Sequence, residues 1–344
     1  MQLTENQPLA PFTTLGIGGP ARWLAEALSE DDIAQACEWA RSRHVPLFVL
    51  GGGSNVLISD RGFPGLVLHI GLMGTSWDGD VLRAAAGVPW EHCVQQTIER
   101  DCAGMECLAG IPGTVGGTPV QNVGAYGQEV ASVIERVRVF DIDAQKFIEF
   151  SAAECEFSYR RSRFNTRDRG RFIVTRVDYR LRRNGRPNLT YSDLKSHFQN
   201  RLEIPSLCEV AEAVREIRRS KAMLLVEGDP DCRSAGSFFK NPAVSQEVAD
   251  KIRRHAEEAG VPLRAFPAAS GLVKIPAAWL IEHAGFAKGY AFGAAGISSR
   301  HTLALISRGG ASAEEIISLA QKIADAVEAK FGVRLEMEPE KVGF

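Results

Sequence analysis

The stretch that decides the fold is GIPGTVGGTPVQNVGAYG, residues 110–127, which contains six glycines. Glycines let backbone N–H groups approach a phosphate closely, and consecutive amides can form an anion-binding nest. A second loop of this kind, LGGGSN at residues 50–55, continues the apolar run VPLFVL. Either loop alone is also typical of ordinary turns. Two such loops, each beside an expected strand, favour a dinucleotide site.

Neither loop fits the common nucleotide-binding patterns. The three consecutive glycines at 51–53 are not followed by the third glycine of GxGxxG, and GxxxxGK[ST] does not occur in the sequence. The Rossmann fingerprint and the P-loop are therefore both excluded.

Length and composition predict a globular protein of two or three domains. The chain has 344 residues and a formal net charge of −2. No basic and apolar leader opens it, and no run of about 18 apolar residues occurs, so we expect a cytoplasmic protein outside the membrane. Its seven cysteines are scattered without a CxxC pair, so we expect buried thiols, no disulfide framework and no metal site.

Hydrophobic periodicity predicts alternating strands and helices. Helices are expected after the N-cap residues Ser29 and Ser245, after Pro89, around Val210–Ile217, and after a capping box of Ser312 with Glu315. Strands are expected at 45–50, 66–70, 81–87, 136–141 and 172–181, the last with one packed face and one face that is wet or binds a ligand. The pattern predicts three packed units of α+β character.

Arginines are concentrated between residues 160 and 186. The eleven members of this cluster are Arg160, Arg161, Arg163, Arg167, Arg169, Arg171, Arg176, Arg180, Arg182, Arg183 and Arg186. A solvated face is the ordinary interpretation and has about half the weight. A phosphate-bearing small molecule and, less favoured, RNA are the alternatives; the aromatic residues needed for base stacking are sparse here.

Five motifs in order carry a family resemblance: GGGSN, IPGTVGGTPVQNVGAYG, SYRRSRF, GSFFKNP and FGVRLEMEPE. Over almost the whole chain the sequence resembles the UDP-N-acetylenolpyruvoylglucosamine reductases. The resemblance implies an α+β fold of the vanillyl-alcohol-oxidase (PCMH) type, with FAD-binding subdomains at 1–70 and 71–208 and a C-terminal substrate-binding domain at 209–344.

The resemblance also implies that the two loops hold FAD. The matching positions are Gly51, Gly52, Gly53, Ser54, Asn55, Pro112, Gly113, Gly116, Gly117, Thr118, Asn122, Gly124 and Ala125. Neither loop contains a histidine, so we expect the flavin to be bound non-covalently. In this family NADPH reduces FAD, and the reduced flavin passes a hydride to the vinyl carbon of the enolpyruvyl substrate.

Three residues match the catalytic positions of the family. Arg160 would hold the substrate carboxylate, Ser237 would donate the proton, and Glu338 would act on the carboxylate or orient Arg160. An alcohol is a very weak acid, but an enolate carbon is basic enough to accept its proton. From the residues alone, a cap for the turn after Gly236 is the favoured role of Ser237, and the resemblance reverses that preference. Glu336, Glu338 and Glu340 alternate along the chain, so a two-residue slip would exchange the candidate carboxylates.

The substrate positions carried over are Tyr159, Tyr191, Lys221 and Asn241. LTYSDL is similar to the form of the family in which a tyrosine loop covers the substrate. The segment AMLLVEGDPDCR after Lys221 is longer than the compact version, which leaves the placement of Lys221 open. An FAD-dependent oxidase of the same fold is the alternative function. We expect a monomer that binds a UDP-sugar and NADPH, without nucleic acid.

Overall fold

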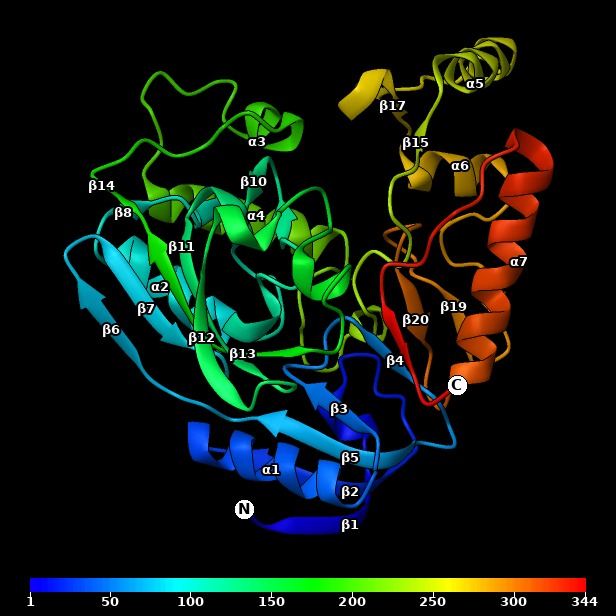
Figure 1. The fold of residues 1–344 in the computed structure, drawn as a ribbon. Helices are drawn as coiled ribbons and strands as arrows, with labels where there is room; N and C mark the ends of the chain where they lie inside the picture. Colours follow the sequence, from blue (N-terminus) through cyan, green and yellow to red (C-terminus); the bar gives the residue numbers. More distant parts are fainter. The chain divides into compact units, whose positions relative to one another are not determined.

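The computed structural model describes residues 1–344 and divides the chain into two compact units (Figure 1). The first unit comprises residues 1–7, 21–53 and 63–220, and the second comprises 8–20, 54–62 and 221–344. Each unit has its own hydrophobic core. None of the helices combines the length and the apolar composition needed to cross a bilayer.

A four-stranded sheet and one helix open the first unit. Its strands β1 (Leu3–Pro8), β2 (Pro20–Ala27), β5 (Phe63–Ile70) and β3 (Leu47–Leu50) lie in that order, and β5 is parallel to both β2 and β3. Helix α1 (Glu30–Ser42) begins at a capping box of Ser29 with Asp32 and buries Ile33, Ala36 and Cys37. The predicted helix after Ser29 and the predicted strands at 45–50 and 66–70 are confirmed.

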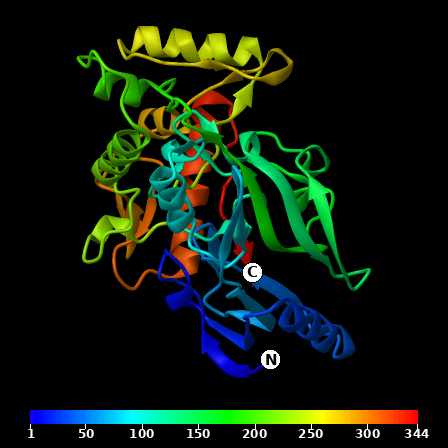
Figure 2. The ribbon, with the colours of Figure 1, turned by 90° about the vertical axis from the view of Figure 1, so that its left-hand side faces the viewer.

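The second sheet of this unit is antiparallel. It contains β12 (Lys146–Ser151), β11 (Ile134–Asp141), β13 (Phe172–Arg180), β7 (Val81–Ala85) and β6 (Thr75–Asp78), in that order. Helix α2 (Trp90–Glu99) lies alongside it (Figure 2), and the Trp90 ring meets Tyr179 edge-on with centroids 5.7 Å apart. Both rings are buried, so this contact joins the helix to the central strand.

Short elements complete the first unit. They are β8 (Cys102–Ala103) paired with β14 (Arg182–Arg183), β9 (Gly124–Ala125) paired with β10 (Gln128–Glu129), and the helices α3 (Ser192–His197) and α4 (Leu207–Ser220). The β9–β10 pair lies at the end of the glycine-rich stretch 110–127.

A long helix, α7 (Ala313–Phe331), packs one face into the hydrophobic core of the second unit. The predicted capping box of Ser312 and Glu315 starts this helix, and Gly332 ends it at a φ of 67°. Helices α5 (Gln246–Glu258) and α6 (Ala277–His283) belong to the same unit. Its strands are β15 (Ala243–Val244), β16 (Phe266–Pro267), β17 (Val273–Lys274), β18 (Ala291–Phe292), β19 (Ala295–Ile297) and β20 (Leu305–Ser307).

Two N-terminal segments belong to the second unit. Strand β4 (Val56–Ile58) pairs in parallel with β21 (Glu340–Val342), so residues 54–62 are held by the end of the chain. The predicted boundary at 208/209 falls inside α4, and the predicted boundary at 70/71 falls inside the first unit. The division into functional domains at 1–70, 71–208 and 209–344 stays a prediction.

Candidate functional site

The two glycine-rich loops meet in the first unit. A Cβ atom added at Gly52 would lie 2.6 Å from Cα of Gly113, and one at Gly51 would lie 3.0 Å from Oγ1 of Thr114. The backbone of Gly52 lies so close to the backbone of Gly113 that no side chain fits at position 52. The sequence predicted a dinucleotide site from the two loops, and the fold brings them together.

The surroundings of these loops fit an anionic cofactor. The N–H groups of Gly51, Gly52 and Gly53 donate to no backbone carbonyl. A Cβ atom at Gly117 would meet no atom within 4 Å, so there is open space beside this backbone. Backbone amides without a backbone acceptor can bind a pyrophosphate, and open space beside the second loop leaves room for a cofactor.

Two residues of the second loop turn their side chains into the protein. The Thr118 hydroxyl lies 2.7 Å from the Tyr179 hydroxyl and donates to the Val115 carbonyl at 2.8 Å. The Asn122 side chain is buried and donates to Glu129 Oε2 at 2.8 Å. Their side chains hold the loop in shape, and contact of their backbone with FAD stays a prediction.

Arg160 occupies a strained position in a tight turn. The Ser158 N–H donates to the Arg161 carbonyl at 2.9 Å, and the Arg161 N–H donates back to Ser158 at 3.0 Å. Arg160 is the second central residue of this turn and has a φ of 56°, a conformation usually taken by glycine or asparagine. Such a backbone costs a non-glycine residue roughly 1–2 kcal/mol. Strain at a non-glycine residue is typical of functional positions.

Three hydrogen bonds attach this turn to the glycine-rich stretch 110–127. Asn122 Nδ2 donates to the Ser158 carbonyl at 3.1 Å, and the Ser162 hydroxyl donates to Val120 at 2.6 Å. Arg160 Nη2 donates to the Gly124 carbonyl at 3.0 Å. The guanidinium is therefore held at the edge of the loop that would carry the cofactor.

Ser237 lies in a loop of the second unit that other residues shape. Gly236 has a φ of 74°, and its N–H donates to the hydroxyl of Ser234, 3.3 Å away. Phe238 and Phe239 are both 1% exposed and anchor the loop in the core. Because Ser234 supplies the hydroxyl that caps this turn, the capping role considered for Ser237 loses its support.

Glu338 is paired with the segment that follows Ser237. Its N–H donates to the Phe238 carbonyl at 2.9 Å, and the Lys240 N–H donates to the Glu336 carbonyl at 3.0 Å. The Glu336 carboxylate is exposed and forms an ion pair with Lys240 Nζ at 2.5 Å. Glu338 is only partly exposed and lies beside the Ser237 loop. This register favours Glu338 over Glu336 as the functional carboxylate.

Asn55 contacts the segment that carries Glu338 within the second unit. Its Nδ2 donates to the Glu338 carbonyl at 3.3 Å, and its own carbonyl accepts the Glu340 N–H at 3.0 Å. Asn55 therefore orients the backbone on which Glu338 stands, in addition to its predicted contact with the cofactor.

Comparison with known proteins identifies the family. Family models match residues 21–147 as an FAD binding domain and residues 229–342 as the UDP-N-acetylenolpyruvoylglucosamine reductase C-terminal domain. The chain is 43% identical to the UDP-N-acetylenolpyruvoylglucosamine reductase of Thermobifida fusca, over 98% of each chain. The chain belongs to the UDP-N-acetylenolpyruvoylglucosamine reductase family. The enzyme of this name from Streptomyces coelicolor is also 43% identical, over 100% of this chain and 91% of that protein.

A solved reductase of the family has the same fold. The crystal structure of the enzyme from Thermus caldophilus matches with a TM-score of 0.69 and 26% identity, over 99% of this chain and 98% of that one. The predicted membership of the UDP-N-acetylenolpyruvoylglucosamine reductase family is confirmed. The α+β fold with an FAD-binding part of the vanillyl-alcohol-oxidase type is confirmed as well.

The substrate positions carried over from the family lie on both units. Tyr191 precedes α3, is 40% exposed, and meets Tyr126 edge-on at 5.3 Å. The Tyr159 ring lies 5.3 Å from the Arg160 guanidinium. In the second unit, Asn241 Oδ1 accepts the N–H of Ala277 at 2.8 Å, which fixes the start of α6. Their contacts with substrate stay predictions.

Two residues that the sequence analysis did not single out, Lys288 and His301, interact electrostatically in the neighbourhood of Lys221. His301 is largely buried; burial, followed by the charges of Lys221 and Lys288, lowers its pKa to about 4. Lys221, Lys288 and His301 therefore share one electrostatic neighbourhood in the second unit. They are far apart in the sequence and form no motif, so only the fold reveals the group.

The long segment after Lys221 is held by two aspartates. Asp229 pairs with Arg300, and Asp231 Oδ2 accepts hydrogen bonds from the hydroxyls of Ser298 at 3.0 Å and Ser299 at 2.7 Å. These contacts bind the segment to the loop between β19 and β20. The extra length is an ordered part of the second unit and leads directly to the Ser237 loop.

Five of the eleven arginines in the cluster form ion pairs with carboxylates, which favours the ordinary interpretation for this part of it. The ion pairs are Arg163–Asp168, Arg167–Glu156, Arg171–Asp141, Arg176–Asp178 and Arg180–Glu135. The predicted open face of β13 is wrong in part, because Val174 and Asp178 on that side are also buried. Phe172 packs there against Phe150, with ring centroids 5.0 Å apart. Paired charges give little attraction for an RNA backbone.

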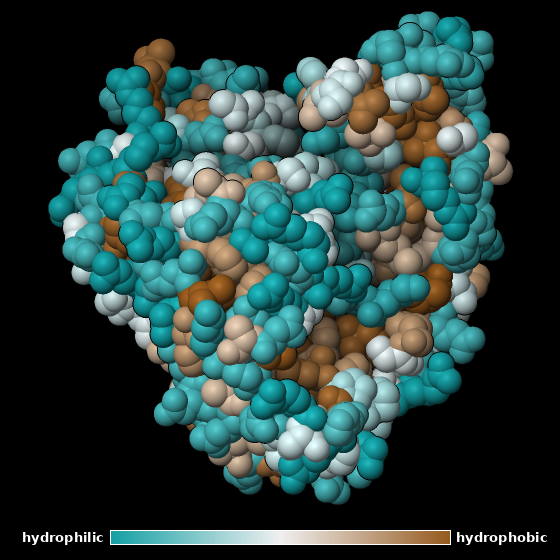
Figure 3. Space-filling model, viewed as in Figure 1, coloured by the Kyte–Doolittle hydropathy of each residue, from teal (hydrophilic) through white to brown (hydrophobic).

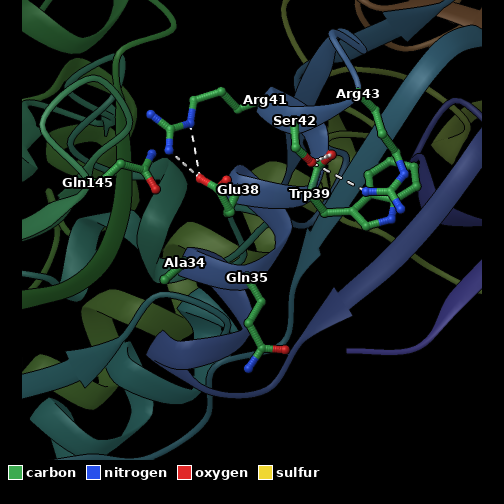
Figure 4. A pocket seen from close by; sticks show the side chains of 8 residues that line it. All are labelled: Ala34, Gln35, Glu38, Trp39, Arg41, Ser42, Arg43 and Gln145. Atoms are coloured by element: carbon green, nitrogen blue, oxygen red, sulfur yellow. Dashed lines mark hydrogen bonds and ion pairs between the residues drawn. The ribbon is translucent and has the colours of Figure 1, made fainter.

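Other surface features do not resemble a site. The hollow beside α1 in Figure 4 is lined by charged groups that already have partners: Arg41 binds Glu38 at 3.0 Å, and Arg43 lies over the Trp39 ring at 4.7 Å. In Figure 3 hydrophobic surface gathers over the β15–β17 part of the second unit, where Phe266 and Leu272 are exposed. Six of the seven cysteines are buried, as predicted.

Proposed function

We propose that the chain is an FAD-dependent reductase that converts UDP-N-acetylenolpyruvoylglucosamine to UDP-N-acetylmuramate, with NADPH as hydride donor. The observation that carries this proposal is 43% identity to a reductase of that name across 98% of both chains. The meeting of the two glycine-rich loops supports it, because Gly52 approaches Gly113 closely and the N–H groups of Gly51, Gly52 and Gly53 donate to no backbone carbonyl.

The loops supply the setting for non-covalent FAD. Gly51, Gly52 and Gly53 on one side and Gly116 and Gly117 on the other would hold the cofactor by backbone contacts. When bound, FAD accepts a hydride from NADPH and delivers a hydride to the vinyl carbon of the substrate. The protein must then bind the substrate carboxylate and protonate the adjacent carbon.

Arg160 suits the first of these tasks. Its guanidinium is a planar fork of N–H donors that can bind a carboxylate in two places and offset the negative charge that develops beside it. The turn and the three hydrogen bonds around it restrict where this fork can point. Arg160 thus needs little reorganisation when the enolate forms.

Ser237 suits the second task, with Glu338 beside it. The Ser237 hydroxyl would give its proton to the enolate carbon, forming the new C–H bond, and the resulting alkoxide would regain a proton from solvent. Glu338 would act on the substrate carboxylate as a protonated donor or orient Arg160. The backbone hydrogen bond from Glu338 to Phe238 supports a common role for the Ser237 loop and the segment that carries Glu338.

The product is a precursor of peptidoglycan, so we place the enzyme in cell wall synthesis, with consequences for cell shape and division. Its substrates, a UDP-sugar and NADPH, are metabolites of the cytoplasm, and the reaction is proposed to occur there. A monomer contains all the residues proposed for the reaction, and size-exclusion chromatography with light scattering would test that state.

An anaerobic two-step experiment tests the proposed function. The purified protein should be yellow and should release FAD on acid or heat denaturation. NADPH should bleach the flavin, and the enolpyruvyl UDP-sugar should restore the colour without oxygen. A colourless protein that FAD cannot reconstitute would refute the proposal. An FAD-dependent oxidase would instead need oxygen for recolouring and would ignore the UDP-sugar.

A further inference from the structure

Glu106 is a buried carboxylate that the proposed reaction does not use. It is 1% exposed and lies in a short 3-10 helix, Glu106–Leu108. Its Oε1 accepts Gln128 Nε2 at 2.6 Å and the Asn188 N–H at 2.9 Å, and its Oε2 accepts the Gly104 N–H at 2.8 Å. A buried carboxylate is tolerated only when it is well hydrogen-bonded. All three partners donate to Glu106, so both of its carboxyl oxygens act as acceptors.

Asn188 extends this network to the loop that carries Tyr191. Its Nδ2 donates to the Gly127 carbonyl at 2.8 Å, and its Oδ1 accepts the N–H of Thr190 at 2.9 Å and its hydroxyl at 2.7 Å. Its backbone carbonyl accepts the Cys107 thiol at 3.1 Å. Both the main chain and the side chain of Asn188 therefore form hydrogen bonds, and this residue lies three positions before Tyr191.

The base of this loop lies directly against the end of the glycine-rich stretch 110–127. A Cβ atom at Gly127 would lie 2.6 Å from Oγ1 of Thr190, so only glycine permits this approach. The Tyr191 ring meets Tyr126 at 5.3 Å with an interplanar angle of 82°. The phenol of Tyr126 is in turn hydrogen-bonded to the buried Arg218 of α4.

We propose that Glu106 and Asn188 are positioning residues that attach the Tyr191 loop to the glycine-rich stretch 110–127. Glu106 accepts from Gln128, just beyond that stretch, and from Asn188 at the base of the Tyr191 loop, so one carboxylate fixes both segments. Asn188 in turn holds Thr190 by two hydrogen bonds, and this fixes the position from which Tyr191 contacts a UDP-sugar. The inference rests on the proposed function, because the loop matters only if this substrate binds.

The position of the Tyr191 loop should affect the half-reaction with the UDP-sugar more than the reduction of the flavin by NADPH. Misplacement of a substrate-positioning group by about 1 Å can cost about a hundredfold in rate. Loss of the Asn188 contacts should therefore raise the KM for the enolpyruvyl UDP-sugar. The NADPH half-reaction does not require Tyr191 to contact the sugar nucleotide and should change little.

Asn188→Ala is the main test, and Asn200→Ala, at an exposed position later in the same segment, is the matched control. We expect Asn188→Ala to raise the KM for the UDP-sugar by about tenfold or more, with anaerobic flavin reduction by NADPH within about twofold of wild type. The Thr190 amide, which loses its acceptor, should exchange hydrogen faster. Asn200→Ala should match wild type in all three measurements.

Glu106→Gln is the second variant, because it keeps the shape but presents an NH₂ group to at least one donor. It should raise the same KM, and the double variant with Asn188→Ala should exceed the larger single effect only slightly, since both act through one network. An unchanged KM in folded, FAD-loaded Asn188→Ala protein would overturn the inference, as would equal losses in both half-reactions. Failure of the wild-type flavin to bleach with NADPH would instead refute the proposed function itself.

Discussion

The amide of Asn122 donates to the backbone carbonyl of Ser158 across 3.1 Å, and so ties the glycine-rich stretch 110–127 to the turn that presents Arg160. Asn122 also accepts the Ala131 N–H at 3.1 Å and donates to Glu129 at 2.8 Å. The Asn122 side chain, which matched a cofactor-binding position, is therefore the joint, that is, the hydrogen-bonded link between the glycine-rich stretch 110–127 and the turn of Arg160. A substitution there changes the orientation of Arg160 as well as the loop.

Ser162→Ala weakens the attachment of the Arg160 turn to the glycine-rich stretch 110–127 without substituting a residue of that stretch. It removes the hydroxyl that donates to Val120 at 2.6 Å and accepts the Phe164 N–H at 3.1 Å. Leaving two buried groups unpaired should cost about 1–3 kcal/mol of the free energy of unfolding. The kcat/KM for the UDP-sugar should fall about tenfold or more, because the fork of Arg160 loses its alignment.

Ser132→Ala is the control for this change, since the exposed Ser132 hydroxyl donates only to the Glu129 carbonyl at 2.7 Å. Urea unfolding and steady-state kinetics report the two effects separately. Equal kcat/KM values for the two alanine variants would show that the joint does not position Arg160.

Arg160→Gly separates strain from catalysis. Glycine adopts the φ of 56° freely, whereas Arg160→Ala keeps a side chain in the strained conformation. We expect the glycine variant to be at least as stable as the alanine variant, despite the greater chain entropy of unfolded glycine. Both should lose the enolpyruvyl reduction by about a hundredfold or more, because neither has a guanidinium. A glycine variant about 1 kcal/mol less stable than the alanine variant would contradict strain at this turn.

Elements with local signals were predicted well from the sequence. The helices after Ser29 and Ser312 start at capping boxes, which depend on residues three positions apart. The pairing of β4 with β21 was not predicted, because short strands from opposite ends of the chain show no local sign of being partners. That pairing places residues 54–62 in the second unit, which no boundary drawn along the sequence could represent.

The candidate site divides in the same way. Arg160, Ser237 and Glu338 are proposed as catalytic residues because their motifs resemble those of a family, and that assignment stays a prediction. The positive φ of Arg160 and the hydrogen bonds of Glu106 depend on tertiary contacts that no spacing encodes. Glycine loops identified the place of the site, and only the fold identified what holds it.

Ser237→Ala should separate the two half-reactions. Flavin reduction by NADPH should stay close to wild type, while recolouring by the UDP-sugar should slow by about a hundredfold or more, because general acid catalysis at this position is lost. Stopped-flow absorbance of the flavin measures each step. Ser234→Ala, which removes the hydroxyl that caps the turn, serves as comparison and should shift stability more than the ratio of the two rates. Equal slowing of both steps in Ser237→Ala would assign the residue a structural role.

Glu338→Gln and Glu336→Gln decide between neighbouring carboxylates. Glu336 forms an exposed ion pair with Lys240, and such pairs contribute about 0–1 kcal/mol, so its variant should remain nearly as active and as stable as wild type. Glu338→Gln should reduce turnover of the UDP-sugar strongly, with flavin reduction by NADPH retained. The reverse ranking of the two variants would mean that the motif is aligned two residues out of register.

The lowered pKa of His301 predicts that the free energy of unfolding decreases in acid. Its folded pKa is lowered to about 4, chiefly by burial and then by Lys221 and Lys288, below the ordinary value near 6.5 for an unfolded chain. The unfolded state therefore binds the proton more readily. The contribution of neutral His301 is fully present above pH 6.5 and is lost as the pH falls from 6.5 towards 4.

Urea unfolding at pH 7.5, 6.0 and 5.0 should show this loss in wild type and a smaller loss in His301→Gln, with the exposed His44→Gln as control. Lys221→Met should make this loss smaller and should end it at a higher pH, because removing a nearby positive charge raises the folded pKa of His301 towards its ordinary value. Identical pH dependence in wild type and His301→Gln would show that this imidazole is not the titrating group.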